Sequence, residues 1–232
     1  MARKKPRREI EIERNVIEKS LMDIKDFVRD NRKTFLYSSV AFLALVVILI
    51  GAFVYVDTVN SRNRAAFDII VEKYDLYSER GDLEQIGPLV KDLKEFVDST
   101  SFGFSHRMAR YMLGSLYFDS GEYGEALACL TKFSRRAPSP FFASLSLVKA
   151  AVCAEELGDY DKALELYAVI EEDFSDSMVV DQALYNKARI YSLKGDYANS
   201  GKYYNRVVTS FPQSPYASRS RKKIMLMGSQ AR

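Results

Sequence analysis

Residues that commonly carry out chemistry are scarce in this sequence. Cys129 and Cys153 are the two cysteines and form no Cys-x-x-Cys motif, and His106 is the single histidine. A zinc site needs three or four such ligands, and a cysteine nucleophile needs a histidine partner, so this inventory supports neither kind of site. The two cysteines either form a disulfide in an oxidising compartment or are two small buried residues.

Carboxylates are the remaining candidates for acid–base chemistry. The members of the pairs Glu155/Glu156 and Glu171/Glu172 are adjacent in sequence. Adjacent residues on a helix point about 100° apart, so neither pair can flank one substrate bond. Gly121, Gly158 and Gly195 mark turns one repeat apart, and the sequence has no glycine-rich phosphate loop. We therefore expect no enzymatic activity, no cofactor and no metal site.

Turns with a regular spacing organise the second half of the chain, with a period of 37 residues. Gly121, Gly158 and Gly195 begin the segments GEYGEAL, GDYDKAL and GDYANSG. In each segment the glycine is expected to end a first helix in a left-handed conformation. The acidic residue that follows can cap the second helix and suits its positive N-terminus. These acidic residues are Glu122, Asp159 and Asp196.

Residues around each turn keep a common register. Small residues recur at Gly114, Ala151 and Ala188 and again at Ala126 and Ala163, where two helices would approach closely. The pattern is a small residue and a tyrosine, then Gly-Asp/Glu-Tyr, alanine, an aromatic residue and proline. This register resembles the tetratricopeptide repeat family. The resemblance implies an all-α solenoid of helix-turn-helix units over residues 57–232.

The resemblance also implies boundaries for the individual units. We expect a degenerate first unit at 57–106, repeats at 107–140, 144–177 and 181–214, and a capping helix at 215–228. In the degenerate unit, around Tyr74, Tyr77 and Gly81, the dipeptide Gly87-Pro88 interrupts where a helix should run. Residues 98–105 are expected to form the connecting loop. The third repeat is weaker, because Lys187 and Ser200 stand at sites that are usually apolar or small.

A basic run in the capping helix has three open interpretations. It is a solvated face, a contact with a membrane surface or a contact with an acidic partner. The run consists of Arg219, Arg221, Lys222 and Lys223. Nucleic acid is a poor partner for the domain, because residues 57–196 carry 16 Lys/Arg against 24 Asp/Glu and the basic tail lacks interleaved aromatic residues.

An uncharged segment of 22 residues, Phe35–Val56, precedes the repeats. A helix of this length reaches about 33 Å, enough to cross a hydrocarbon core about 30 Å thick. Tyr37 and Tyr55 lie near its ends, where aromatic rings favour the lipid interface. We predict a transmembrane helix at 34–56, rather than a buried core helix or a cleaved signal peptide.

Charge asymmetry gives this predicted span a direction. Residues 19–33 hold five Lys/Arg and residues 57–71 hold two. The positive-inside rule then places the N-terminus in the cytoplasm and the domain in the periplasm, as a single-pass protein of a bacterial inner membrane. The head, residues 1–33, joins a basic arm to an amphipathic helix with an apolar stripe at Ile17, Leu21, Ile24 and Val28. The arm either touches anionic lipid or only sets topology, and the stripe either lies on the membrane or docks on a partner.

The repeat resemblance implies a concave groove lined by the first helix of each repeat. The candidate groove residues are Met108, Tyr111, Ser115, Phe118, Asp119, Leu145, Val148, Val152, Glu155, Glu156, Gln182, Tyr185, Arg189 and Ser192. This apolar and acidic mixture suits an extended or helical polypeptide with apolar anchors. The Lys/Asn clamp that some members use on a C-terminal carboxylate is absent, since Val148 and Val152 stand where polar residues would be needed. Ordinary inter-helix packing is the alternative role for each residue.

The order of head, span and repeats resembles the inner-membrane tetratricopeptide proteins of the YfgM type, which accompany the Sec translocon and periplasmic chaperones. The matching features are Ile24-Lys25-Asp26-Phe27 and Asn31 in the head and an aromatic, Arg-bearing helix with Arg62 and Tyr74 after the span. The resemblance implies a membrane-anchored protein-interaction module, an adaptor or chaperone accessory near the translocon. The alternative is a structural scaffold of an envelope machine for secretion, division or the flagellar motor.

Overall fold

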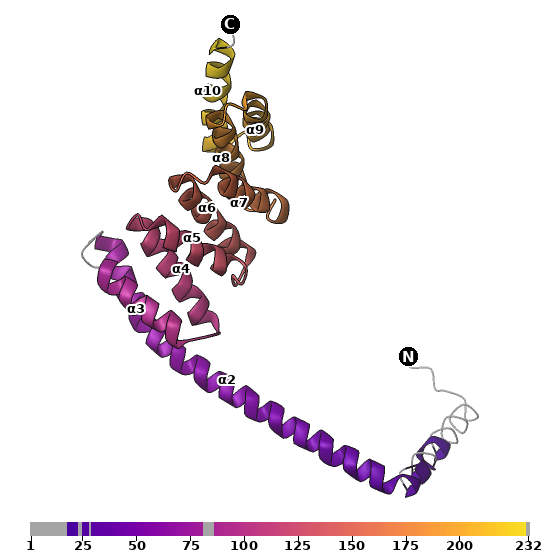
Figure 1. Cartoon of the computed structure of the whole chain (residues 1–232). Coiled ribbons are helices and arrows are strands. Elements are labelled where there is room, and N and C mark those ends of the chain that lie inside the picture. The colour runs from indigo at the N-terminus through magenta and orange to yellow at the C-terminus, as the bar shows by residue number, and fades with distance from the viewer. Residues whose placement is uncertain (1–17, 23–24, 28, 81–85, 231–232) are drawn as a thin grey trace, which may run out of the picture. The chain divides into compact units, whose positions relative to one another are not determined.

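The computed structural model describes residues 18–22, 25–27, 29–80 and 86–230 (Figure 1). All regular secondary structure in these ranges is α-helical. The chain divides into two compact units, residues 1–59 and 60–232. Of the stripe predicted in the head, Ile17, Ile24 and Val28 lie outside the described residues, and Leu21 lies on a helical segment with its side chain exposed.

Helix α2 extends from Arg32 to Arg80 and contains the whole predicted span. No proline occurs between Pro6 and Pro88, so no residue in this stretch lacks a backbone N–H for the helix. None of the residues in the most apolar window of the helix is buried, and the helix is long and apolar enough to cross a membrane. Large side chains such as Phe42, Ile48 and Phe53 are exposed along it.

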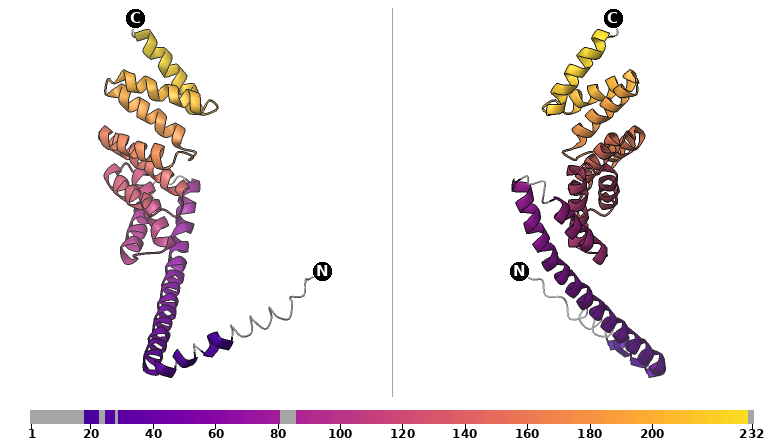
Figure 2. Two further views of the ribbon diagram at one scale, coloured as in Figure 1. Left: turned by 90° about the vertical axis from the view of Figure 1, so that its right-hand side faces the viewer. Right: turned by 60° about the vertical axis from the view of Figure 1, so that its left-hand side comes forward.

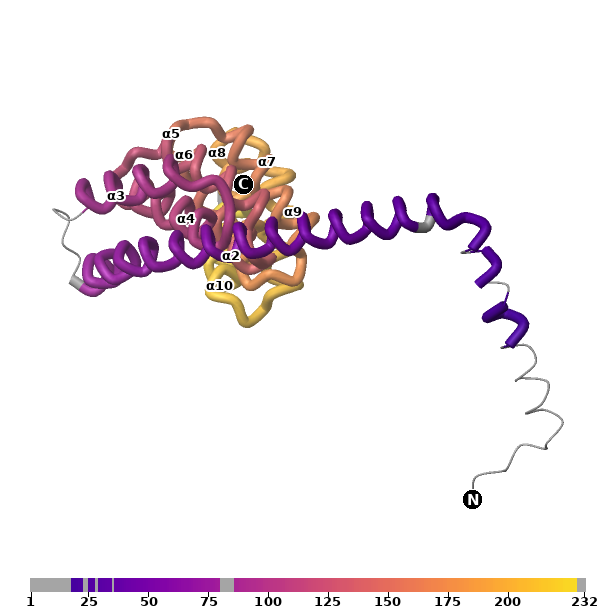
Figure 3. Tube along the Cα trace, turned by 90° about the horizontal axis from the view of Figure 1, so that it is seen from below, coloured from indigo at the N-terminus to yellow at the C-terminus, as the bar shows by residue number. Residues whose placement is uncertain are grey.

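The second unit is a series of helices that each pack against the next along the chain (Figure 2, Figure 3). After α2 they are α3 (Ile86–Ser99), α4 (Phe104–Asp119), α5 (Tyr123–Ser134), α6 (Pro140–Glu156), α7 (Tyr160–Asp173), α8 (Val180–Leu193), α9 (Tyr197–Ser210) and α10 (Pro215–Gln230). The helices α4 and α5, α6 and α7, and α8 and α9 form three helix pairs. Each of these pairs overlaps one predicted repeat, and α10 overlaps the predicted cap.

The C-terminal end of α2 and helix α3 form a further helix pair, which precedes these three pairs in the sequence. The rings of Phe67 and Phe96 lie 5.7 Å apart between their centroids, and Lys73 Nζ lies 2.6 Å from an oxygen of Asp92. The expected interruption at Gly87-Pro88 is absent: helix α3 begins at Ile86 and contains both residues in its first turn. Proline is tolerated there because a first-turn N–H has no partner within the helix. The predicted Gly81 lies outside the described residues.

The three glycine turns have the predicted left-handed backbone. Gly121, Gly158 and Gly195 have φ values of 79°, 77° and 78°. The predicted caps are confirmed at two turns: Asp159 accepts a hydrogen bond of 3.0 Å from the backbone N–H of Lys162, and Asp196 accepts one of 3.0 Å from Asn199.

The third predicted cap is wrong. Glu122 occupies the N-cap position of α5 without a side-chain capping bond, and its carboxylate instead accepts a hydrogen bond of 3.2 Å from the hydroxyl of Ser120. Glutamate is not among the preferred N-cap residues, whose shorter side chains reach the first backbone N–H groups of the helix.

Small residues bring the helices of each pair together, as predicted. A Cβ added to Gly114 would lie 2.9 Å from Cγ of Leu130 and 3.1 Å from Cβ of Cys129. Ala151 and Ala188, at the same register, are fully buried. Between them lie large buried side chains that fill the core: Leu116, Leu130, Phe133, Tyr167, Ile170, Leu184, Ile190, Tyr204 and Val207.

Candidate functional site

All fourteen predicted groove residues lie on α4, α6 and α8, the first helices of the three pairs. Ser115, Val148 and Glu155 are buried, so these three belong to the packing of the helices. The other eleven are exposed or half-buried, and we call them the first-helix face. They are Met108, Tyr111, Phe118, Asp119, Leu145, Val152, Glu156, Gln182, Tyr185, Arg189 and Ser192.

Lys149 of α6 joins several of these residues. Its ammonium nitrogen donates a hydrogen bond of 3.1 Å to the hydroxyl of Ser115. The same nitrogen lies 5.8 Å from the ring centroids of both Tyr111 and Phe118, within the range of a cation–π contact. The sequence prediction missed Lys149. Its signal was a single basic residue within the otherwise apolar stretch FFASLSLVKAAVCA.

Asp119 provides the opposite charge on this part of the face. Burial lowers the pKa of Lys149, and the negative charge of Asp119 works against that shift. Burial and then the charge of Asp119 raise the pKa of Tyr74 to about 12, and the same two causes raise the pKa of Tyr77. The end of α2 therefore contributes two tyrosines to the surroundings of Asp119, which makes this a tyrosine-rich site with one cation and one anion.

Aromatic neighbours hold two tyrosines of the first-helix face in place. The ring centroid of Tyr111 lies 5.0 Å from that of Phe133 and 6.0 Å from that of Phe142. Tyr185, which stands two repeats further on at the same register, lies 5.5 Å from Tyr204 and 5.3 Å from Tyr216. Both rings are half-buried, so each offers one part of its surface to a partner in a fixed orientation.

Two of the predicted residues, Glu155 and Arg189, bind each other instead of facing solvent as separate charges. Glu155 also accepts a hydrogen bond of 2.8 Å from the hydroxyl of Tyr167, and that hydroxyl oxygen accepts one of 2.9 Å from Asn186. Glu155 is 8% exposed and its charge is paired. The acidic character that we expected here therefore comes from Asp119 and the exposed Glu156.

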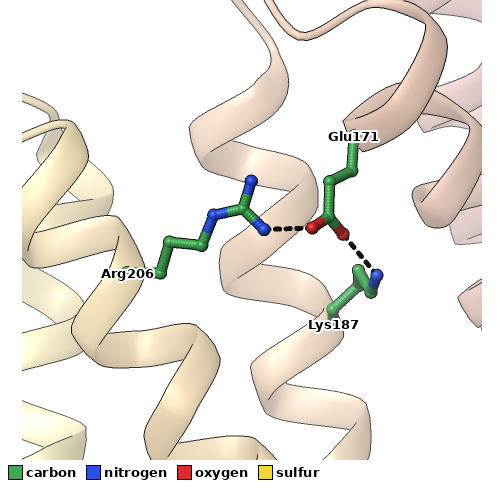
Figure 4. A network of polar contacts seen from close by, with 3 residues as sticks. All are labelled: Glu171, Lys187 and Arg206. Carbon is green, nitrogen blue, oxygen red and sulfur yellow. Dashed lines mark hydrogen bonds and ion pairs between the residues drawn. The ribbon is translucent and has the colours of Figure 1, made fainter.

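A second ionic network fastens the same two repeats through α7, α8 and α9. Glu171 lies between two cations: Lys187 Nζ approaches one carboxylate oxygen at 2.5 Å, and Arg206 pairs with the other (Figure 4). Burial raises the pKa of Glu171, but hydrogen bonds from both cations outweigh it and the net shift is downward. Lys187 also lies 4.5 Å from the ring centroid of Tyr203. Glu171 thus has a structural role, and the irregular Lys187 of the third repeat is its buried partner.

The thiols have little reactivity in this environment. Cys129 and Cys153 are free, half-buried and buried respectively, so the disulfide alternative is not realised. Burial raises the pKa of both thiols, that of Cys153 to about 11. A thiol in this state is rarely ionised near neutral pH and is a weak nucleophile. Among the described residues, no group of three or more His, Cys, Asp or Glu side chains could hold a metal ion.

Comparison with known proteins identifies the repeats. Tetratricopeptide repeat family models match residues 111–177 and 181–214. A TPR repeat-containing protein of Treponema pallidum (strain Nichols) is 26% identical over 117 residues, which are 50% of this chain and 48% of that protein. The chain thus spans about half the length of this curated relative.

Solved structures show the same fold. The crystal structure of a tetratricopeptide repeat protein from Parabacteroides merdae superposes with a TM-score of 0.57 at 20% identity, over 72% of this chain and 61% of that one. A putative kinesin light chain with TPR-like repeats from Podosopora anserina gives a TM-score of 0.52 at 18% identity, over 71% and 84% of the two chains. Residues 111–177 and 181–214 of this chain are therefore similar to tetratricopeptide repeats, and the solved structures share its helical fold.

Proposed function

We propose that this protein is a membrane-anchored tetratricopeptide repeat module that binds polypeptides in the cell envelope. The apolar part of α2 crosses the bacterial inner membrane once, and the repeats lie in the periplasm. Two observations support the anchor. None of the residues in the most apolar window of the helix is buried, and the basic residues before the span outnumber those after it. In water these apolar side chains would be exposed to solvent, whereas in a bilayer the lipid tails would cover them.

The binding role is supported most by the cluster of Tyr111, Phe118 and Ser115 around Lys149. The half-buried rings of Tyr111 and Phe118, each in a cation–π contact with Lys149, provide fixed apolar surface beside a single positive charge. Such a site suits an extended segment that places an apolar side chain on the rings and a carboxylate at Lys149. Tyr185 offers a second apolar contact two repeats away.

The particular form that we propose is an adaptor or chaperone accessory near the Sec translocon, where emerging chains pass the first-helix face. A site with one charge of each sign and several rings selects general properties of a polypeptide rather than one sequence. Such broad selectivity suits a protein that binds many different polypeptides. A structural scaffold of an envelope machine would instead keep one permanent partner.

Photo-crosslinking in native membranes tests the binding site. A photoreactive amino acid replaces Tyr111 or Tyr185 in the full-length protein, and the control replaces the exposed Tyr197 on the second helix α9. We expect many secreted proteins to be trapped at Tyr111 and Tyr185 and few at Tyr197. Equal trapping at all three positions would contradict a site on the first-helix face. A single stoichiometric partner at Tyr111 would favour the scaffold and contradict the adaptor.

Protease treatment of spheroplasts tests the anchor. We expect external protease to digest the repeats while the head, residues 1–33, stays protected. Repeats that resist protease until the membrane is dissolved would place the domain in the cytoplasm and overturn the proposed topology. The result does not depend on the crosslinking result, so the two parts of the proposal can fail separately.

A further inference from the structure

A small basic cavity lies at the first turn of α4 and the last turn of α5. Its volume is about 90 Å³. One water needs about 10–15 Å³ measured in this way, so the cavity has room for a group of several atoms. The cavity is lined by Ser101, Phe102, Gly103, His106, Arg107, Arg110, Lys132, Phe133 and Arg136. Four of these residues are cationic and none is acidic.

These four cations have no carboxylate partner among the residues that the structure describes. Arg107, Arg110, Lys132 and Arg136 form no ion pair within the described residues, although the domain around them is rich in acid. The Nε atom of Arg107 is buried and has no hydrogen-bond partner among them either. Converging like charges repel one another, and a bound anion would relieve that repulsion.

A chain of hydrogen bonds orients one of the arginines. The hydroxyl of Thr100 donates to the backbone oxygen of Phe96 at 2.7 Å, so its oxygen is left to accept from Nδ1 of His106 at 2.9 Å. A guanidinium only donates, so Nε2 of His106 accepts from Arg110 at 3.0 Å. His106 is therefore a neutral ring with its proton on Nδ1, and it fixes Arg110 at the cavity wall.

The beginning of α4 adds a further positive end. Gly103, the N-cap residue, has φ of 97° and provides no side chain to cap the helix. The first backbone N–H groups of a helix have no partners inside it, and the helix dipole makes this end attractive to anions. This helix end and the four basic side chains belong to the same cavity, which Gly103 itself lines.

We propose that this cavity binds a phosphate group. A dianion balances converging positive charges better than a single carboxylate does, and arginine forks match the tetrahedral oxygens of phosphate in bidentate pairs. The phosphate belongs either to free inorganic phosphate or to the headgroup of a phospholipid. None of the eleven residues of the first-helix face lines this cavity, so the proposal does not depend on their function.

The single histidine provides a reporter for binding. Burial, followed by the charges of Arg110, Lys132, Arg107 and Arg136, lowers the pKa of His106 below 6.5. A bound dianion offsets those charges, so the pKa of His106 should rise on binding. Because the chain has one histidine, its ring protons give an unambiguous signal in a nuclear magnetic resonance spectrum.

The experiment uses the full-length protein in neutral detergent micelles at pH 7.5. Inorganic phosphate is titrated in one arm and phosphatidylglycerol is added to the micelles in the other, each compared with chloride at equal ionic strength. We expect a saturable shift of the His106 signals in at least one arm and a higher pKa at saturation. The arm that responds identifies the source of the phosphate. No shift in either arm, or an equal shift with chloride, overturns the proposal.

Paired charge variants test where the anion binds. Lys132→Gln with Arg136→Gln removes two cavity charges from exposed positions and leaves the His106–Arg110 bond in place. Lys222→Gln with Lys223→Gln removes the same charge from the exposed face of α10. Hydrogen bonds to charged groups are strong enough that we expect affinity to fall roughly tenfold or more in the first variant only. Equal losses in both variants would show non-specific attraction and overturn the proposal.

Discussion

The interface between the first repeat (α4 and α5) and the second (α6 and α7) differs in chemistry from the interface between the second and the third (α8 and α9). We call these interfaces the first joint and the second joint. At the first joint Tyr111 of α4 packs on Phe142 of α6, and Lys149 makes a single polar contact with Ser115. At the second joint charged pairs cross in three places. These are Glu155 with Arg189, Glu171 with Lys187 and Arg206, and Asp161 with Lys194.

Both joints connect helix pairs that contain the same glycine turn, so backbone register alone does not decide what holds repeats together. The first joint depends on apolar burial, which responds weakly to pH and salt. The second depends on charges, some of them buried, whose contribution varies with protonation. One solenoid therefore has two joints that respond differently to their surroundings.

The largest expected effect comes from removing the shared carboxylate of the second joint. Glu171→Leu leaves the side chain of Lys187, which is 6% exposed, without its partner. An unpaired buried charge costs about 3–5 kcal/mol, and we expect a loss near the lower figure because Lys187 keeps its contact with Tyr203. Urea unfolding of the full-length protein measures the change. Arg206→Gln is the control, with an expected loss below about 1 kcal/mol because Arg206 is 45% exposed.

The close packing of α4 against α5 inside the first repeat should be sensitive to an added methyl group. Gly114→Ala places a Cβ 2.9 Å from Leu130 Cγ, and overpacking of this kind costs about 1–3 kcal/mol. The matched control is Gly124→Ala, where nothing lies within 4 Å of the added Cβ and the helix is stabilised. That control should raise stability by about 0.5–1 kcal/mol. Equal midpoints for the two variants in thermal unfolding would show that α4 and α5 are less tightly packed than described.

Low pH should weaken the ionic second joint and leave the apolar first joint largely unchanged. The pKa of Glu171 is lowered from 4.5, so its contribution is present above that pH and is lost as pH falls below it. The pKa of Lys187 is raised from 10.5, so its contribution is present below that pH and is lost above it. The stability difference between the natural protein and Glu171→Leu should therefore be constant between these limits and shrink outside them. A difference that stays constant down to pH 3 would contradict an ionic second joint.

The smallest effect concerns the caps. Asp159→Ala removes a capping hydrogen bond of 3.0 Å to the N–H of Lys162, and losing such a cap costs about 1 kcal/mol. Glu122→Ala, at the equivalent turn of the first repeat, removes no cap and should leave stability nearly unchanged. Hydrogen exchange at the first turns of α5 and α7 reports the two changes separately. Faster exchange in α5 with Glu122→Ala would mean that Glu122 caps its helix after all.

Local features of the repeats could be predicted from sequence because they recur. Three glycines at one spacing predicted three left-handed turns, and the small residues at Gly114 and its equivalents predicted close helix contacts. The position of Gly87-Pro88 misled the prediction, because a proline breaks the interior of a helix but is tolerated in its first turn.

Contacts between repeats could not be predicted. Glu155 and Arg189 are 34 residues apart, as are Lys149 and Ser115, and no local pattern pairs residues over such a separation. The acidic groove expected from sequence counted Glu155 as a free charge, although its partner Arg189 was among the predicted residues. Lys187, which weakened the repeat pattern, is explained only once Glu171 lies beside it.

The three glycine turns should distinguish an L-amino acid from a D-amino acid placed at the same position. Gly121, Gly158 and Gly195 share nearly the same positive φ, and nothing lies within 4 Å of a Cβ added to any of them. Replacement by L-alanine would meet no neighbour, so its cost of about 1–2 kcal/mol would be torsional alone. A D-alanine, whose mirror-image preferences favour positive φ, would escape that cost. The turns thus offer three equivalent positions where chirality can be measured apart from packing.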